Sequence, residues 1–88
     1  MTANIIVPQQ LRNYTGGRTS VSVQGDTIDQ VMSDLDRQFP GIRFRVIDEQ
    51  GRIRRHMRIF VNGDRSVSID ETLTPDSEVH ILGALSGG

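Results

Sequence analysis

Residues 27–39 read TIDQVMSDLDRQF, and this stretch decides the fold. Thr27 followed three residues later by Gln30 fits the capping box with which helices begin. The apolar residues that follow recur at helical spacing and form one stripe, made of Ile28, Val31, Met32, Leu35 and Phe39. Pro40-Gly41 ends the helix, because proline disfavours helical geometry in the residue before it. A single helix with one apolar stripe can cover one face of one sheet, so we predict a two-layer α+β domain.

Two strands are predicted on the N-terminal side of this helix. The apolar run Asn4–Val7 is stopped by Pro8 and is typical of a buried strand. Residues Arg18–Val23 alternate between valine and serine, as a half-buried strand does. The paired glycines Gly16-Gly17 supply a turn between the two segments. We therefore expect these strands to form a hairpin.

The segment after the helix is less regular before it becomes strand again. Residues 42–55 mix apolar residues with arginines, and we expect an irregular excursion with some strand and a turn at 48–51. His56–Val61 is predicted as a strand, and Asn62-Gly63 after it is the strongest short hairpin signal. Val67 and Ile69 would then form a short edge strand.

The last predicted strand, Glu78–Leu82, runs directly into a tail of small residues. The tail consists of Gly83, Ala84, Leu85, Ser86, Gly87 and Gly88. Extended, it reaches at most about 20 Å at roughly 3.3–3.6 Å per residue. Because glycine lacks a Cβ, the end of the tail can enter a channel too narrow for side chains. We expect residues 1–82 to form one domain and residues 83–88 to be a flexible tail that delivers the carboxylate of Gly88.

The composition excludes several classes of protein. The chain has no cysteine, which excludes disulfides, thiolate catalysis and Cys-ligated metal sites. A net charge of −1 argues against general nucleic-acid binding, and no segment approaches the ~18 apolar residues of a membrane span. We expect a cytoplasmic protein with no membrane association. Lysine is also absent, either because the genome favours arginine codons or because a lysine amine would compete for an activated acyl group.

Positive charge is concentrated in the middle of the chain. Residues 37–65 hold eight arginines and three acidic residues, a local charge of +5, whereas residues 1–36 carry −2 and residues 66–88 carry −4. Such a run is either a solvated face or a docking surface, and the sequence leaves both interpretations open.

The expected order is strand, strand, helix, strand, short strand, strand. This is the order of the β-grasp, or ubiquitin-like, fold, in which a mixed sheet of four to five strands carries one main helix and the first and last strands lie parallel at its centre. Several motifs fit a family with this fold: Val7-Pro8, Thr15-Gly16-Gly17, Gly25-Asp26-Thr27, Pro40-Gly41, Ile59-Phe60-Val61-Asn62, Val79-His80-Ile81-Leu82 and the final Gly87-Gly88. With these motifs over nearly its whole length, the chain resembles the ubiquitin-like sulfur carrier proteins of the ThiS/MoaD family. Within it, the likeness is to the carriers of thiocarboxylate-dependent cysteine synthesis in actinobacteria.

The resemblance implies a carrier with no catalysis of its own. An ATP-dependent activating enzyme would adenylate Gly88, and sulfur would replace the adenylate to give a thiocarboxylate. A partner synthase would use that sulfur to make cysteine, a thiosugar or a thiazole, and a metalloprotease could trim the product. Gly83, Ala84, Leu85, Ser86 and Gly87 would enter the partners' active sites, while the free carrier would be a monomer without bound cofactor or metal. Molybdopterin-type carriers have Pro-Pro where this chain has Gly83-Ala84, which argues against that pathway.

A docking patch is predicted on the face of the sheet away from the helix. By strand parity it holds Arg58, Phe60, His80 and Leu82, and similar positions in ubiquitin form its apolar binding patch. We interpret His80 as a surface histidine of this patch, because no Ser, Cys or acidic partner accompanies it in a known catalytic motif. His56 is interpreted as structural or solvent-facing.

Two other functions fit the same sequence. The chain could be a protein modifier whose activated Gly88 is transferred to lysine amines, or a non-catalytic adaptor that binds through its sheet. A conventional enzyme is disfavoured, because no paired carboxylates, metal-ligand spacing or phosphate-binding glycine loop is present.

Overall fold

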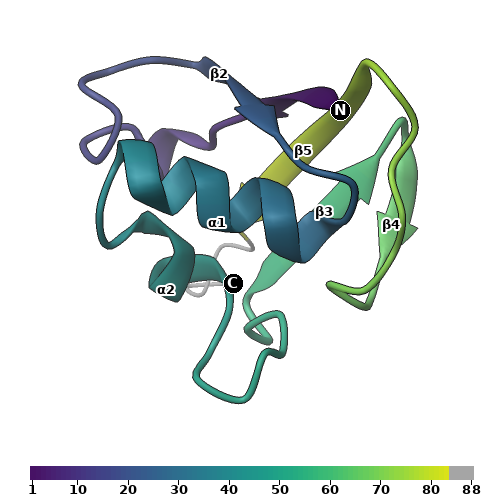
Figure 1. The fold of residues 1–88 in the computed structure, drawn as a ribbon. Helices are drawn as coiled ribbons and strands as arrows, with labels where there is room; N and C mark the ends of the chain where they lie inside the picture. Colours follow the sequence, from purple (N-terminus) through teal and green to yellow (C-terminus); the bar gives the residue numbers. More distant parts are fainter. Residues whose placement is uncertain (84–88) are drawn as a thin grey trace.

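The fold is a five-stranded sheet with the main helix packed on one face (Figure 1). The computed structural model describes residues 1–83. Its elements, in chain order, are β1 (Thr2–Ile6), η1 (Gln9–Leu11), β2 (Ser20–Gln24), α1 (Ile28–Gln38), α2 (Ile42–Val46), β3 (Met57–Val61), β4 (Asp64–Ser66) and β5 (Ser77–Gly83). The two-layer α+β arrangement predicted from the sequence is therefore confirmed.

The last strand lies at the centre of the sheet. The strand order is β2-β1-β5-β3-β4, with β5 parallel to β1 and antiparallel to β3. Ile81 of β5 pairs with Ile59 of β3, and both side chains are buried. The expected central, parallel placement of the first and last strands is confirmed. Strand β5 is thus hydrogen-bonded along both edges, which makes it a rigid support for whatever follows it.

The core fills the space between the sheet and α1. Its deeply buried members come from both layers and include Ile5, Ile28, Val31, Met32, Leu35, Ile42, Val46, Ile59, Val79 and Ile81. Burying one such side chain contributes about 1.5–3 kcal/mol. Thr27 caps α1 as predicted, its Oγ1 accepting a hydrogen bond from the backbone N–H of Gln30 at 3.2 Å. In return the Gln30 side chain accepts from the backbone N–H of Asp26 at 2.6 Å, one residue earlier than in the usual capping box.

The segment 42–55, expected to be an irregular excursion with some strand, begins instead with the short helix α2 at residues 42–46. Ile42 and Val46 are both buried, whereas Phe44 between them is 53% exposed. Apolar residues at i, i+2 and i+4 suit a strand, but the first and last also lie on one face of a helical turn. The helix is started by Asp36, whose carboxylate accepts the backbone N–H groups of Gly41 at 3.0 Å and Arg43 at 3.1 Å.

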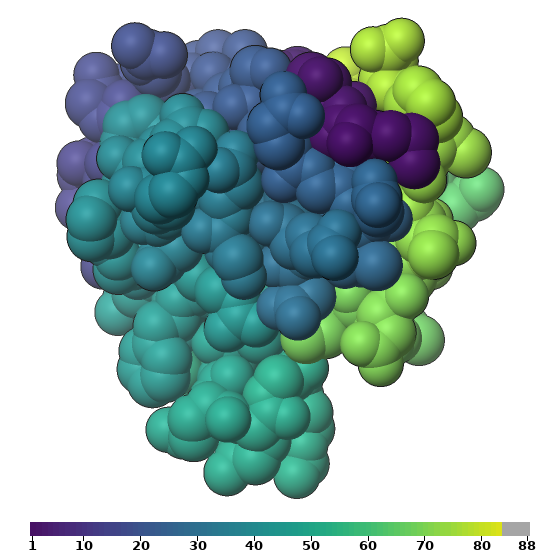
Figure 2. All heavy atoms as spheres, viewed as in Figure 1, coloured from purple at the N-terminus to yellow at the C-terminus, as the bar shows by residue number. Residues whose placement is uncertain are grey.

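The loop that follows α2 protrudes from the rest of the molecule (Figures 1 and 2). It contains the expected turn, in which Asp48 Oδ1 accepts the backbone N–H groups of Gln50 and Arg52. The extended structure in this region is limited to one isolated bridge between Ile47 and Ile53. Strand β3 then begins at Met57, one residue later than predicted.

The edge strand is also shifted from its predicted place. Asn62 and Gly63 have φ angles of 51° and 92°, the left-handed geometry of a two-residue hairpin turn, so the hairpin prediction is confirmed. Because this turn is so short, Val61 pairs directly with Asp64 and the edge strand is residues 64–66. Val67, predicted to lie in that strand, is 78% exposed. Within the described part of the chain, no helix has the length and apolar character needed to cross a lipid bilayer.

Candidate functional site

The tail is attached to the end of the central strand. Strand β5 continues through Gly83, one residue beyond the predicted Leu82, and Gly83 pairs with Met57 of β3. The remaining predicted tail residues, Ala84, Leu85, Ser86, Gly87 and Gly88, lie outside the described residues. The side chain of Gln10 crosses Gly83 so closely that a Cβ at position 83 would overlap its amide group. A side chain at the base of the tail would therefore require the exposed Gln10 side chain to move.

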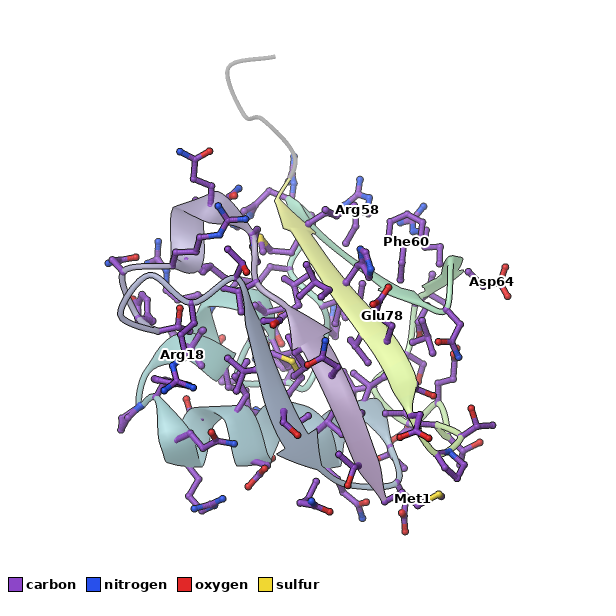
Figure 3. The ribbon with its side chains drawn as sticks, turned by 90° about the horizontal axis from the view of Figure 1, so that it is seen from above. Met1, Arg18, Arg58, Phe60, Asp64 and Glu78 are labelled. Carbon is purple, nitrogen blue, oxygen red and sulfur yellow. The ribbon has the colours of Figure 1, made fainter. Side chains whose placement is uncertain are left out.

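The structure brings the four predicted patch residues together on the face of the sheet opposite α1. Arg58 pairs with Leu82 and Phe60 pairs with His80 across β3 and β5, so all four side chains share one face. Figure 3 shows Arg58 and Phe60 side by side along these strands. Leu82 is 47% exposed, and the other three side chains are partly exposed. The arrangement offers an apolar surface with one positive charge, which suits the docking of another protein. Its role in docking stays a prediction.

A shallow depression lies in this patch. Its volume is about 330 Å³, and it is lined by Phe60, Asn62, Gly63, Glu78, His80 and Leu82. Glu78 Oε1 lies 2.7 Å from His80 Nε2, so the histidine does have an acidic neighbour, although the pair contains no nucleophile. This pair orients the imidazole at the edge of the depression.

Sequence reasoning missed two contributors to the patch. Ile6 is the parallel partner of His80 and is only half-buried, although the run Asn4–Val7 was predicted as a buried strand. Ala3, Ile5 and Val7 point into the core, and this alternation was the signal that would have placed Ile6 on the other face. Glu78 was missed for a similar reason, since it lies two residues before His80 on the same face.

His56 lies apart from the patch. Its side chain is exposed, which agrees with the solvent-facing interpretation of this residue. Its neighbour Arg58 folds its guanidinium back along the chain, where Nη1 donates to the backbone carbonyl of Arg55 at 2.6 Å and that of Met57 at 2.9 Å. Arg58 therefore joins the patch to the arginine-rich segment that precedes β3.

Comparison with known proteins identifies the family. Residues 5–88 match the ThiS family. The chain belongs to this family. It is 36% identical to the sulfur carrier protein CysO of Mycobacterium tuberculosis over 93 residues, with 100% of each chain covered, and is therefore a CysO homologue. The expected family resemblance is confirmed.

Solved structures of relatives confirm the ubiquitin-like β-grasp fold. The crystal structure of M. tuberculosis CysO matches with a TM-score of 0.88 and 34% identity, over 94% of this chain and 99% of that one. The Amycolatopsis orientalis BexX/CysO complex matches with a TM-score of 0.90 and 27% identity, over 98% and 99% of the two chains. SAMP1 from Haloferax volcanii, at 21% identity and a TM-score of 0.84 over 100% of both chains, shares the fold.

Proposed function

We propose that this chain is a sulfur carrier whose Gly88 carboxylate is adenylated, converted to a thiocarboxylate and used as the sulfur source of a partner synthase. The observation that carries the proposal is the continuity between β5 and the tail. Strand β5 is the central strand, its last residue Gly83 is paired with β3, and the family match runs on to Gly88. A rigid strand followed by a short tail of small residues suits the delivery of one reactive group into another protein's active site.

The chemistry needs an external activating enzyme. A carboxylate with a pKa near 3.5 is ionised at neutral pH and is a poor electrophile. Attack of its oxygen on the α-phosphate of ATP forms an acyl-adenylate and releases pyrophosphate. A sulfide-equivalent donor then attacks the acyl carbon, AMP leaves, and a thiocarboxylate remains. Transfer of this sulfur to the synthase's electrophile, followed by hydrolysis, regenerates the carboxylate of Gly88.

The residues of this chain bind the partner enzymes and position the tail, and they do no catalysis themselves. The sheet holds the base of the tail, and the patch formed by Arg58, Phe60, His80 and Leu82 docks the partner enzymes. The M. tuberculosis and A. orientalis relatives support this division of roles, because one is named as a sulfur carrier and the other was solved as a complex with BexX. We propose the same kind of complex for this chain, with an activating enzyme, a sulfur-accepting synthase and a product-trimming metalloprotease as partners.

Intact-mass measurement of the protein isolated from its native cells tests the proposal. The expected result is a fraction of molecules in which one oxygen has been exchanged for sulfur at the C-terminus. Deleting Gly88 should abolish this species while the thermal unfolding midpoint stays unchanged. Retention of sulfur loading after the deletion would exclude the tail as the carrier site.

The same cells test the role of protein modifier. Blotting of whole lysate for this chain should show the free protein alone if it is a carrier. A ladder of larger covalent adducts that disappears when Gly88 is deleted would instead identify the chain as a protein modifier. If the cells contain neither covalent adducts nor the sulfur-loaded form, the remaining interpretation is an adaptor that binds through its sheet.

A further inference from the structure

Five arginines gather on one surface at the start of β3. This basic surface consists of Arg52, Arg54, Arg55, Arg58 and Arg65, and a further arginine, Arg45, lines the depression beside Phe44 at its margin. Three shallow depressions with volumes of about 390, 300 and 430 Å³ adjoin one another there, because Arg54 lines all three. His56 lines two of them, and Asp48 is the single acidic residue among the lining residues.

The charge of this surface is not neutralised within residues 1–83. None of its five arginines forms an ion pair there, whereas Arg37 pairs with Asp34 and Arg43 pairs with Asp29 elsewhere on the molecule. Within the same range, the nearby carboxylate of Asp48 forms no ion pair with these five arginines, and its Oδ1 already accepts hydrogen bonds from two backbone N–H groups. The N–H of Arg52, then that of Gln50, and the positive charges of Arg52 and Arg54 hold the pKa of Asp48 below its ordinary value of 3.8, although desolvation opposes this.

Two of the arginines are held in place before any partner arrives. Arg54 Nε donates to the carbonyl of Phe44 at 2.7 Å, and its guanidinium lies 4.5 Å from the centre of the Phe44 ring. Arg58 is held by two backbone carbonyls. Because these side chains are already ordered, less conformational entropy is lost when they bind. Phe44 and Val67, 53% and 78% exposed, add apolar area within and beside the charges.

The basic surface lies next to the point where the tail leaves the sheet. Met57, between its arginines, is the cross-strand partner of Gly83, and Arg58 is the partner of Leu82. Arg58 belongs both to the basic surface and to the docking patch, so the two are continuous. A protein that takes up the tail must approach this side of the molecule.

We propose that the basic surface docks an acidic surface of the activating enzyme, beside the channel that receives the tail. This inference rests on the proposed function and names the surface by which the enzyme recognises the carrier. A protein partner is favoured over a nucleic acid because the flanking residues 1–36 and 66–88 carry charges of −2 and −4 and would repel a long polyanion. Arginine and exposed aromatic residues together are also the composition typical of protein interfaces.

Charge complementarity of this kind acts mainly on association. It steers the two proteins together and is weakened by salt, because charges separated by more than about 8 Å are screened at physiological ionic strength. The basic surface should therefore set the KM for the carrier and its dependence on salt. It should leave kcat unchanged, since its arginines lie on the folded domain and not on the reacting tail.

The test is ATP–pyrophosphate exchange by the activating enzyme of the same organism, with carrier concentration and salt varied. Arg55→Glu changes an exposed side chain that makes no hydrogen bond within residues 1–83, and Arg65→Glu provides a second variant on β4. The matched control is Arg18→Glu, which has the same charge change on the β2 side of the sheet, away from Arg58 (Figure 3). We expect KM to rise about tenfold for Arg55→Glu with a flatter salt dependence, and Arg18→Glu to behave as wild type.

Three outcomes would overturn the inference. First, both Arg55→Glu and Arg65→Glu could keep the KM and salt dependence of wild type. This result would show that the surface does not dock the activating enzyme, while the proposed carrier function would stand. Retardation of a mixed-sequence RNA by wild type but not by Arg55→Glu would replace the protein partner with nucleic acid. Failure of the wild-type chain to support exchange would overturn both the inference and the proposed function.

Discussion

Asp36 Oδ1 lies 3.1 Å from the backbone nitrogen of Arg43, so a carboxylate near the end of α1 begins α2. The same oxygen accepts the N–H of Gly41 at 3.0 Å. Arg43 in turn reaches back to α1 and pairs with Asp29 at 2.6 Å. The two helices are thus linked in both directions, and this link fixes where Phe44 and the loop before β3 lie.

Replacing Asp36 with alanine should destabilise the protein by about 1 kcal/mol, the usual effect of removing a helix cap. The measurement is the free energy of unfolding by urea, together with hydrogen exchange at the amide of Arg43, which should become faster. Ser33→Ala, at an exposed position of α1, is the control and should change stability little. Unchanged exchange at Arg43 would exclude Asp36 as the cap of α2.

Asp34 attaches α1 to β2. Its Oδ2 accepts the backbone N–H of Gln24 at 2.9 Å, and its Oδ1 accepts from Arg37 at 2.6 and 2.9 Å. Replacement by asparagine removes the charge from these hydrogen bonds and should lower the free energy of unfolding at pH 7 by about 1 kcal/mol. Equal stability of the two proteins would show that this attachment contributes nothing.

The effect of Asp34 should depend on pH. The N–H of Gln24 and then the Arg37 guanidinium hold the pKa of Asp34 below its ordinary value of 3.8, with desolvation opposing them. A carboxylate with a lowered folded-state pKa stabilises the fold above its unfolded pKa, and this contribution is lost as the pH falls through the folded value. The stability difference between wild type and Asp34→Asn should therefore be constant near neutrality and shrink below about pH 4. A difference that stays constant in acid would contradict the lowered pKa.

Gly83 and Gln10 should be energetically coupled. A methyl group at position 83 must displace the Gln10 amide, which is exposed and can rotate away at a strain of about 0.5–1.5 kcal/mol. Gly83→Ala should therefore lower the stability more in the wild-type background than in the Gln10→Ala background. A double-mutant cycle by thermal unfolding measures this coupling, and additive effects would show that the two residues are independent.

Phe60 should contribute to partner binding and little to folding, because it is partly exposed on the outer face. If it is a central contact, Phe60→Ala should weaken binding of the activating enzyme tenfold or more, about 1.4 kcal/mol. Calorimetric titration measures this affinity. Ser22→Ala, on the same face of β2 with strands β1 and β5 between it and Phe60, is the control, and equal losses in both variants would argue against a local patch.

Regular elements with unambiguous spacing were predictable from the sequence. The stripe from Ile28 to Leu35 and the cap at Thr27 fit only a helix, and Asn62-Gly63 fits only a tight hairpin. The grouping of the four predicted patch residues on one face followed from strand parity alone, because antiparallel partners such as Phe60 and His80 must share a face.

The helix α2 could not be predicted in this way. Its sequence, IRFRV, alternates like a strand, and what makes it helical is a carboxylate contributed by Asp36 from the preceding helix. The basic surface was visible as a run of arginines, but its position beside the tail depends on the pairing of Met57 with Gly83. Both features depend on tertiary contacts that residue spacing does not encode.

The parallel pairing of β1 with β5 has a practical consequence. Since both strands run in the same direction, Met1 lies at the opposite end of the sheet from Gly83 (Figure 3). An affinity handle, a fluorophore or a surface tether fused ahead of Met1 would lie remote from the end of the sheet at which we propose that partner enzymes take up the tail. Its main disturbance would be to the exposed ion pair between the terminal amine and Asp26 at 3.3 Å, which is worth at most about 1 kcal/mol. Immobilised carrier should thus remain competent for pull-down and single-molecule work.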